Sequence, residues 1–453
     1  MSIGERFSIR TLARHGAAAG VIKLASAGLT FLLFVAAAMV TDQRQFGLFS
    51  TAYAGASLVS FFSIVGQHAA VMRFWPQYAG GQDIPSANGL MARAIGVTLT
   101  GLVVSVVFVL AAGFVPFLGR GVPEWRDLCL ATAALTFALG WSEFTSCAFR
   151  AKNVLIGGLL PRDIVWRVLT IGAFAMAALL AVSVNAVFAT WLAAALLLLC
   201  VLPQTITLLR DTRRLPRGPL TSAQKAEFKN VTIGLWGVTA LPPALGQAST
   251  LLVAAILGPE AAGAIFVADR VMRLAILALN GINQAIAPQI SSTFHRGDRA
   301  HVQRLTSLAA IGGFALALAM VLVFVLFGRP ILAVFDPAYS TGTMHAVLII
   351  LGLGALVGTA CGPTELTMQL TGLQRALFTT LVVVNTLGLG ATAALTASFG
   401  PIGAAFGIAG TMMTWCVIGA TITRRRIGID PSVLGFLAGE DASAVRTILK
   451  GRS

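Results

Sequence analysis

Six ionisable side chains lie inside long apolar stretches of this sequence, where a charge is costly to keep. They are Lys23, Glu143, Asp269, Arg270, Arg273 and Glu365. A charged residue at the centre of a membrane helix costs about 2.5–3.5 kcal/mol on insertion scales, so each is a candidate functional group. Fixed charges in apolar surroundings can bind ions of opposite sign or relay protons. No cofactor and no metal is expected, because the five cysteines show no metal-ligand spacing.

The densest group of these charges lies in the eighth apolar stretch. Asp269 and Arg273 are four residues apart and Arg270 and Arg273 are three apart, so they share one side of a helix. The same side continues through Asn280 and Gln284. A surface facing lipid could not be so polar. This side is therefore predicted to line an aqueous lumen, although Asp269 and Arg273 could instead neutralise each other and merely fix helix packing.

Weaker polar stripes follow the first two apolar stretches. They consist of Lys23, Ser26 and Thr30 in the first stretch, and of Tyr53, Ser57, Ser60, Gln67 and Arg73 in the second. Neither Lys23 nor Arg270 has an obvious partner nearby in the sequence. Counting Lys23, Arg270 and Arg273 against Asp269 leaves a positive excess in the lumen, which predicts an anionic ligand.

The two glutamates allow two interpretations. Glu143 and Glu365 lie near the ends of their apolar stretches and could bind a coupling cation or a proton. Alternatively, they reach the membrane surface or pair with Arg150 or Arg375. His68 is interpreted as a packed or hydrogen-bonded histidine.

The elements that must hold these residues are membrane helices. The 453 residues are 57% apolar and 11% charged, with a mean hydropathy of +0.85. A helix needs roughly 20 apolar residues to cross a bilayer. The sequence therefore predicts an all-α polytopic membrane protein. Its twelve expected spans are 16–40, 47–71, 89–115, 127–150, 162–182, 186–209, 231–257, 262–288, 305–327, 343–368, 376–397 and 402–423.

The basic residues are distributed unevenly between the gaps. Of the 32 Lys and Arg residues, 25 lie in the termini and every second gap, and four lie in the other gaps. The positive-inside rule places the gaps rich in Lys and Arg, and both termini, in the cytoplasm. Anionic lipid of the inner leaflet is a sufficient partner for the net charge of +15, and nucleic acid is not expected.

The sequence also predicts two halves. Residues 1–209 form an N-terminal six-helix half, 210–230 a cytoplasmic linker, 231–423 a C-terminal six-helix half and 424–453 a basic cytoplasmic tail. An even number of spans makes the halves parallel repeats. Pro242–Pro243 is expected to interrupt the seventh span, as a hinge or a static kink.

Three segments carry a family resemblance. They are FGLFSTAYAGASLVSFFSIVGQHAAVMRFWPQYAGG (46–81), LGPEAAGAIFVADRVMRLAILALNGINQAIAPQISSTFHRGD (257–298), and GPTELTMQLTGLQRA with FGPIGAAFGIAG (362–376 and 399–410). Together they resemble the multidrug/oligosaccharidyl-lipid/polysaccharide (MOP) exporter superfamily, specifically its bacterial polysaccharide flippase branch. The resemblance implies a V-shaped pair of six-helix bundles around a central cavity, in the bacterial inner membrane. It also implies that cavity cations hold the diphosphate of a polyprenyl-linked oligosaccharide, with Arg270 and Lys23 at cationic positions of the family and Arg273 as a further candidate.

The favoured hypothesis is that the protein moves a polyprenyl-diphosphate-linked oligosaccharide from the inner to the outer leaflet for surface polysaccharide synthesis, by alternating access. Polysaccharide polymerase or assembly proteins are expected further partners. The first alternative is a cation-coupled multidrug exporter of the same superfamily, which needs carboxylates in its lumen. The second is a membrane-embedded glycan polymerase or ligase, but the outer gaps lack the acid–base residues for that chemistry. The protein is therefore not expected to be an enzyme.

Overall fold

The computed structural model describes residues 9–115, 119, 121–216, 218 and 221–438. All secondary structure in this part of the chain is helical. The elements are α1 (Ile9–Val40), α2 (Gln43–Ser63), α3 (Gln67–Gly80), α4 (Ile84–Ala112), α5 (Trp125–Ala151), α6 (Leu155–Leu160), the π-helical turn η1 (Pro161–Val165), α7 (Trp166–Leu179), α8 (Ala186–Arg214), α9 (Ser222–Leu257), α10 (Pro259–His295), α11 (Arg299–Ala333), the 3₁₀ turn η2 (Pro337–Tyr339), α12 (Gly342–Ala360), α13 (Thr364–Leu370), α14 (Gln374–Ile427) and α15 (Val433–Ala438).

The helices agree with the twelve expected spans. Three spans are interrupted: the second comprises α2 and α3, the fifth comprises α6, η1 and α7, and the tenth comprises α12 and α13. α14 contains the last two spans, and its backbone leaves helical geometry at Gly400 as predicted. α9, in contrast, continues through Pro242–Pro243, where the sequence predicted an interruption. Within the described residues, eight helices are long and apolar enough to cross a membrane.

Polar side chains at the helix starts explain several of these boundaries. Asp42, Asn185, Asp298 and Thr341 each accept a hydrogen bond from a backbone N–H in the first turn of the helix that follows. Such caps satisfy donors that would otherwise have no partner at a helix end. Thr221 forms a reciprocal capping box at the start of α9.

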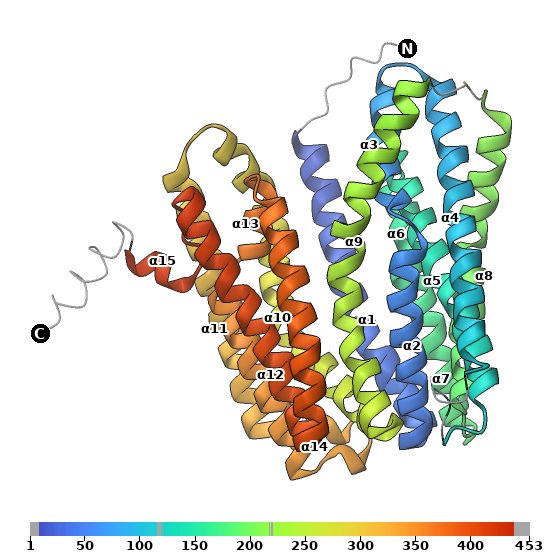
Figure 1. Ribbon diagram of the computed structural model, residues 1–453, viewed down its shortest axis with the longest axis vertical. Helices are drawn as coiled ribbons and strands as arrows, with labels where there is room; N and C mark the ends of the chain where they lie inside the picture. Colours follow the sequence, from blue (N-terminus) through green and yellow to red (C-terminus); the bar gives the residue numbers. More distant parts are fainter. Residues whose placement is uncertain (1–8, 116–118, 120, 217, 219–220, 439–453) are drawn as a thin grey trace, which may run out of the picture. The chain divides into compact units, whose positions relative to one another are not determined.

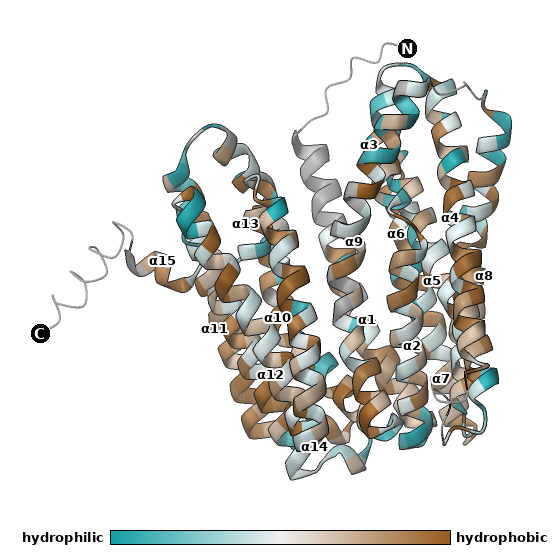
Figure 2. Ribbon diagram, in the orientation of Figure 1, coloured by the Kyte–Doolittle hydropathy of each residue, from teal (hydrophilic) through white to brown (hydrophobic). Residues whose placement is uncertain are grey.

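The helix surfaces are apolar in the way that a lipid environment requires. On α4, Val104 and Phe108 are 63% and 68% exposed, and on α11 Leu326 is 71% exposed. Figure 2 shows α8 as hydrophobic along most of its length, with hydrophilic residues towards its end. Large exposed apolar side chains in such numbers are expected of a surface that contacts acyl chains.

The chain divides into two compact units, Met1–Gly263 (unit 1) and Ala264–Ser453 (unit 2). The boundary lies in the first turns of α10, and α9 belongs to unit 1, where it packs against α2 (Figure 1). The sequence assigned α9 to the C-terminal half. The six-and-six division around the linker at 210–230 stays a prediction.

Similar side-chain hydrogen bonds occur near the starts of α4 in unit 1 and α11 in unit 2. Near the start of α4, the Asn88 side chain donates to the carbonyls of Thr212 and Leu215, 124 and 127 residues further on. Near the start of α11, the Gln303 side chain donates to the carbonyl of Asp430, 127 residues further on. The Asn88 contacts join α4 to the end of α8, and the Gln303 contact joins α11 to the chain that follows α14.

The break between α2 and α3 positions the first site residues. Gly66 has φ +69°, which a residue with a side chain rarely adopts, and its Cβ position is only 2.8 Å from the carbonyl oxygen of Thr232 on α9. The indole of Trp236 on α9 donates to the carbonyl of Phe62 at the end of α2. The chain therefore restarts at Gln67, and α3 presents His68 and Arg73 from its first turns.

Candidate functional site: a cationic cluster in unit 1

Glu143 on α5 joins two arginines from different parts of the sequence. It forms ion pairs with Arg162 of η1 and with Arg150 of its own helix, the latter at 3.8 Å. The thiol of Cys147 lies 3.5 Å from Glu143, and Arg150 donates to the Cys147 sulfur at 2.8 Å. The expectation that Glu143 pairs with Arg150 is confirmed, and Arg162 is an additional partner.

Asp163 forms the second centre of the network. Its side chain is only 3% exposed and accepts a hydrogen bond from Lys23 Nζ on α1 at 2.6 Å. Arg167 on α7 lies 3.6 Å from the other carboxylate oxygen, and its Nε donates to Thr30 on α1 at 2.7 Å. Lys23, for which the sequence offers no partner nearby, is thus paired with a residue 140 positions away.

These side chains form one charged group, called here the unit 1 charge cluster. Its members are Lys23, Glu143, Arg150, Arg162, Asp163 and Arg167. Four cations face two carboxylates, so the cluster has an excess of two positive charges. Removing charges from water is costly unless they are paired. The excess is thus the part of the cluster that a bound anion would neutralise.

The turn η1 brings the two centres together. Arg162 and Asp163 are adjacent in this π-helical turn and contact partners on α5 and α1 respectively. Gly158 in α6 allows the approach to α5, since a Cβ there would lie 2.9 Å from the carbonyl of Ser146. Gln204 on α8 donates to the Gly158 carbonyl at 3.2 Å. Single π-helical turns inside α-helices occur frequently at functional sites.

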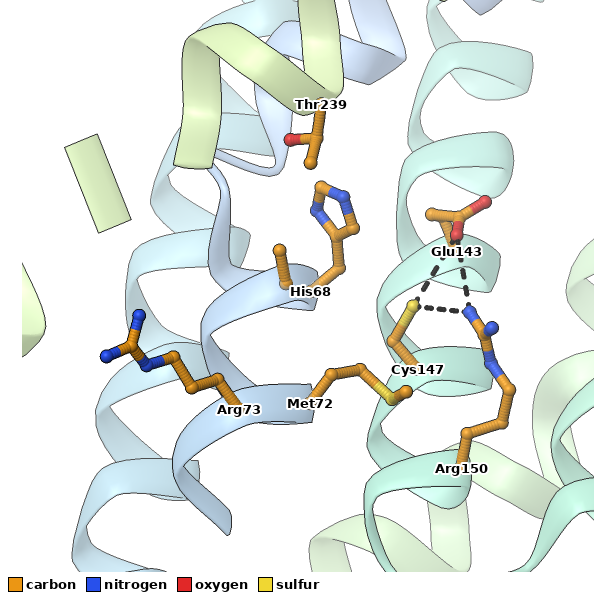
Figure 3. Close-up of a pocket in the computed structure, with 8 residues that line it drawn as sticks. His68, Met72, Arg73, Glu143, Cys147, Arg150 and Thr239 are labelled. Atoms are coloured by element: carbon orange, nitrogen blue, oxygen red, sulfur yellow. Dashed lines mark hydrogen bonds and ion pairs between the residues drawn. The ribbon is translucent and has the colours of Figure 1, made fainter. Parts of the chain in front are cut away.

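A cavity of about 450 Å³ lies beside the cluster in unit 1. Figure 3 shows His68, Met72 and Arg73 on one wall and Glu143, Cys147 and Arg150 on the other. Its lining residues are His68, Ala69, Met72, Arg73, Glu143, Cys147, Arg150 and Thr239. Ligand pockets typically have volumes of about 300–1,000 Å³, with a few charged groups among apolar side chains. Guanidinium groups in this setting suit a phosphate or carboxylate ligand.

The predicted charges of the eighth span lie on α10, in unit 2. Arg273 donates to Asp269 at 2.7 Å from Nε and 3.2 Å from Nη2, so these two residues neutralise each other as one interpretation anticipated. The guanidinium of Arg270 lies 4.4 Å from the ring centre of Phe266. Asn280 is exposed. The side chain of Gln284 lies outside the described part of the structure.

The remaining candidates have distinct surroundings. Glu365 on α13 is exposed and accepts a hydrogen bond from Gln369 at 3.1 Å. Gln67 is buried, and its amide donates to the Val65 carbonyl at 3.3 Å. His68 lines the unit 1 cavity. The assignment of Lys23, Arg270 and Arg273 to one lumen between the two halves stays a prediction.

Sequence reasoning overlooked half of the cluster. Asp163 is not among the six predicted intramembrane charges, and Arg162 and Arg167 are not among the predicted site residues. All three lie within the expected fifth span, 162–182, close to its start. The signal was present, because an arginine and an aspartate follow Pro161 directly at the start of an apolar stretch.

Solved membrane-transport structures share this architecture. An inward-facing multidrug resistance MATE family transporter of the MOP superfamily superimposes with a TM-score of 0.69 at 15% identity, covering 90% of this chain and 98% of that one. The outward-facing form of such a transporter gives 0.63 at 17% identity, with 91% and 95% covered. A MOP superfamily transporter from Pyrococcus furiosus, described as having a binding pocket of reverse polarity, gives 0.62 at 17% identity, with 91% and 95% covered.

The chain has the MATE-like fold. This result confirms the predicted all-α fold. The likeness extends over nine tenths of the chain. At 15–17% identity the likeness concerns the fold alone. No family model and no curated protein matches the sequence.

Proposed function

We propose that this MATE-like protein transports a polyprenyl-diphosphate-linked oligosaccharide from the cytoplasmic to the outer leaflet of the bacterial inner membrane. The observation that carries the proposal is the excess of two positive charges in the unit 1 charge cluster. A diphosphate esterified at both ends carries one negative charge on each phosphate. Such a head group would neutralise the cluster, whereas a cationic drug would increase its net charge.

The location of the cluster is consistent with loading from the cytoplasm. Glu143 lies eight residues before the end of α5, which is about 12 Å at 1.5 Å per residue. Lys23 lies seven residues into the expected first span, 16–40, and Arg162 and Asp163 precede α7. By the positive-inside rule these are the cytoplasmic ends of the helices. A head group entering from the inner leaflet would therefore meet the cluster before the middle of the membrane.

The membrane potential would favour outward movement of this substrate. Moving one negative charge outward across an inside-negative membrane releases about 2.3 kcal/mol per 100 mV. We infer that no dedicated coupling ion is needed for an anionic head group. This mechanism leaves Glu143 and Glu365 without a required role as coupling-ion ligands.

The second candidate function is cation-coupled multidrug export, which the fold neighbours favour. Such export uses carboxylates that are available to a cationic substrate. In this chain Glu143, Asp163 and Asp269 are each paired with arginine or lysine, whereas Glu365 is exposed and accepts a hydrogen bond from Gln369. The neighbour with a pocket of reverse polarity indicates that different polarities occur within this fold. The pairing of Glu143, Asp163 and Asp269 supports the anionic substrate over the drug, and the neighbour shows that the fold permits a different polarity.

Reconstituted proteoliposomes can distinguish the two functions. The vesicles would contain a short-chain polyprenyl diphosphate disaccharide with a fluorescent label, and its exposure at the outer surface would be followed by quenching. We expect the full-length protein to accelerate movement of the diphosphate lipid more than that of the matching monophosphate lipid. A cationic dye should not be moved. Movement of the dye without movement of either lipid would establish the drug exporter instead.

A further inference from the structure

One wall of the unit 1 cavity is closed by an ion pair rather than by apolar packing. Glu143 and Arg150 both line the cavity, and their side chains are 21% and 25% exposed. Figure 3 shows them with Cys147 as a triangle of contacts facing His68. Arg162 contacts the same carboxylate and is 19% exposed. A ligand that enters this cavity therefore meets a carboxylate and a guanidinium already in contact.

Arg150 is held loosely. Its contact with Glu143 is 3.8 Å, which is beyond hydrogen-bond distance. The hydrogen bond that it donates ends on the Cys147 sulfur, which is a weak acceptor. Little favourable interaction would thus be lost if the guanidinium turned towards a stronger acceptor.

Two buried nitrogens of the cavity wall lack hydrogen-bond partners in the described structure. They are Nε of Arg150 and Nδ1 of His68. Buried polar atoms nearly always have a partner, and an unsatisfied one costs about 1–3 kcal/mol. Both residues line the same cavity. A ligand with several acceptor oxygens would supply the missing partner of Arg150.

We propose that Glu143 is a displaceable internal anion of this site. Its carboxylate pairs with the guanidinium groups of Arg150 and Arg162 when the cavity is empty. A phosphate of the substrate then displaces the carboxylate from these groups. This inference rests on the proposed function, since it assigns the head-group diphosphate to this cavity. Phosphate competes well for arginine, because it offers more acceptor oxygens than a carboxylate and binds the planar fork in a bidentate manner.

The displacement has a consequence for release. An internal competitor lowers the affinity for the head group, and it returns to the arginines when the head group leaves. Transport needs binding that is strong enough for loading and weak enough for release. Removing the charge of Glu143 should therefore tighten binding and slow turnover. A purely structural role for Glu143 predicts weaker binding and slower turnover together.

The first test measures binding of inorganic pyrophosphate to the full-length protein in detergent by calorimetry. We expect Glu143→Gln to bind pyrophosphate about tenfold more tightly than the wild type, which corresponds to about 1.4 kcal/mol. The matched control is Glu260→Gln, which removes an exposed carboxylate in the first turn of α10 and should leave the affinity unchanged. Equal or weaker binding by Glu143→Gln would overturn the inference while leaving the proposed function intact.

A second test keeps Glu143 and therefore does not depend on the folding of that variant. Cys147 is buried against Glu143 and Arg150, so movement of both should expose its thiol. In a protein whose other four cysteines are replaced by alanine, pyrophosphate should accelerate maleimide labelling of Cys147 severalfold over chloride at equal ionic strength. An unchanged or slower labelling rate at saturating pyrophosphate would overturn the displacement, because a ligand that merely fills the cavity shields Cys147 in its lining. Absence of pyrophosphate binding in both the wild type and Glu143→Gln would contradict the head-group site itself, and with it the proposed function.

Discussion

The charges of unit 1 and those of α10 in unit 2 use the same residue types in opposite ways. In unit 1, Lys23 and Asp163 are 140 residues apart, and their side chains are 48% and 3% exposed. On α10, Arg273 and Asp269 are four residues apart, and their side chains are 46% and 15% exposed, so the two pairs differ in the burial of the carboxylate. The first arrangement depends on the packing of α1, α5, η1 and α7. The second requires only that α10 be a helix.

This difference determines the energetic role of each group. Removing one partner of a buried ion pair leaves an uncompensated charge and costs about 3–5 kcal/mol. An exposed pair on one helix contributes about 0.3–0.5 kcal/mol. The unit 1 charge cluster is therefore expected to be part of the folding of unit 1. The α10 pair is expected to matter little for stability.

The largest effect on stability is expected for Asp163→Ala. This change leaves Lys23 and Arg167 without their shared carboxylate, and we expect a loss of about 3–5 kcal/mol in the free energy of unfolding. Thermal unfolding of the purified protein in detergent would measure it. Asp211→Ala is the control. The Asp211 side chain is 41% exposed, so its ion pair with Lys152 should contribute at most about 1 kcal/mol. Equal effects would remove the distinction between the two regions.

The same contrast explains which features could be predicted from the sequence. The spans follow from apolar length, and the Asp269–Arg273 pair follows from a spacing of four residues on a helix. The pair Lys23–Asp163 could not be derived, because no local pattern connects residues 140 positions apart. The π-helical turn that aims Arg162 and Asp163 at different helices also has no periodicity of its own.

The boundary of unit 1 shows a similar limit. The linker at 210–230 is predicted from its proline, glycine and charge; in the structure α8 continues to Arg214 and α9 begins at Ser222, so both helices extend into this segment. The packing of α9 against α2 depends on the tertiary contacts of Gly66 and Trp236, which composition does not reveal. Hydropathy predicts where a helix lies in the chain and leaves its neighbours undetermined.

Transport activity gives the next comparison, because a charge that contributes little to stability can still bind substrate. We propose that Arg270, which lies over the ring of Phe266, contacts the anionic head group. Arg270→Ala should then slow movement of the diphosphate lipid about 10- to 100-fold, the loss of one charged hydrogen bond, with normal membrane insertion. The proteoliposome assay measures this, with the exposed Arg299→Ala as the control. An unchanged rate would exclude Arg270 from head-group binding.

The repeated contacts near the starts of α4 and α11 should have similar effects in the two units. Asn88→Ala removes the donor to the carbonyls of Thr212 and Leu215. Gln303→Ala removes both hydrogen bonds to the backbone of Asp430. We expect each to lower the free energy of unfolding by about 1–3 kcal/mol, because buried backbone groups lose their partners. Thermal unfolding is again the measurement. A large effect in one unit and none in the other would contradict the proposed equivalence of these contacts.

The smallest effect is expected for the α10 pair itself. A double-mutant cycle of Asp269→Ala and Arg273→Ala should give a coupling energy of about 0.5 kcal/mol in thermal unfolding, because the pair is local and its arginine is 46% exposed. The parallel cycle of Lys23→Ala and Asp163→Ala should give a several-fold larger coupling, since the Asp163 side chain is 3% exposed. If the α10 coupling were the larger of the two, Asp269 and Arg273 would have to be part of a buried network rather than a local pair. Buried ion pairs would then no longer distinguish unit 1 from unit 2.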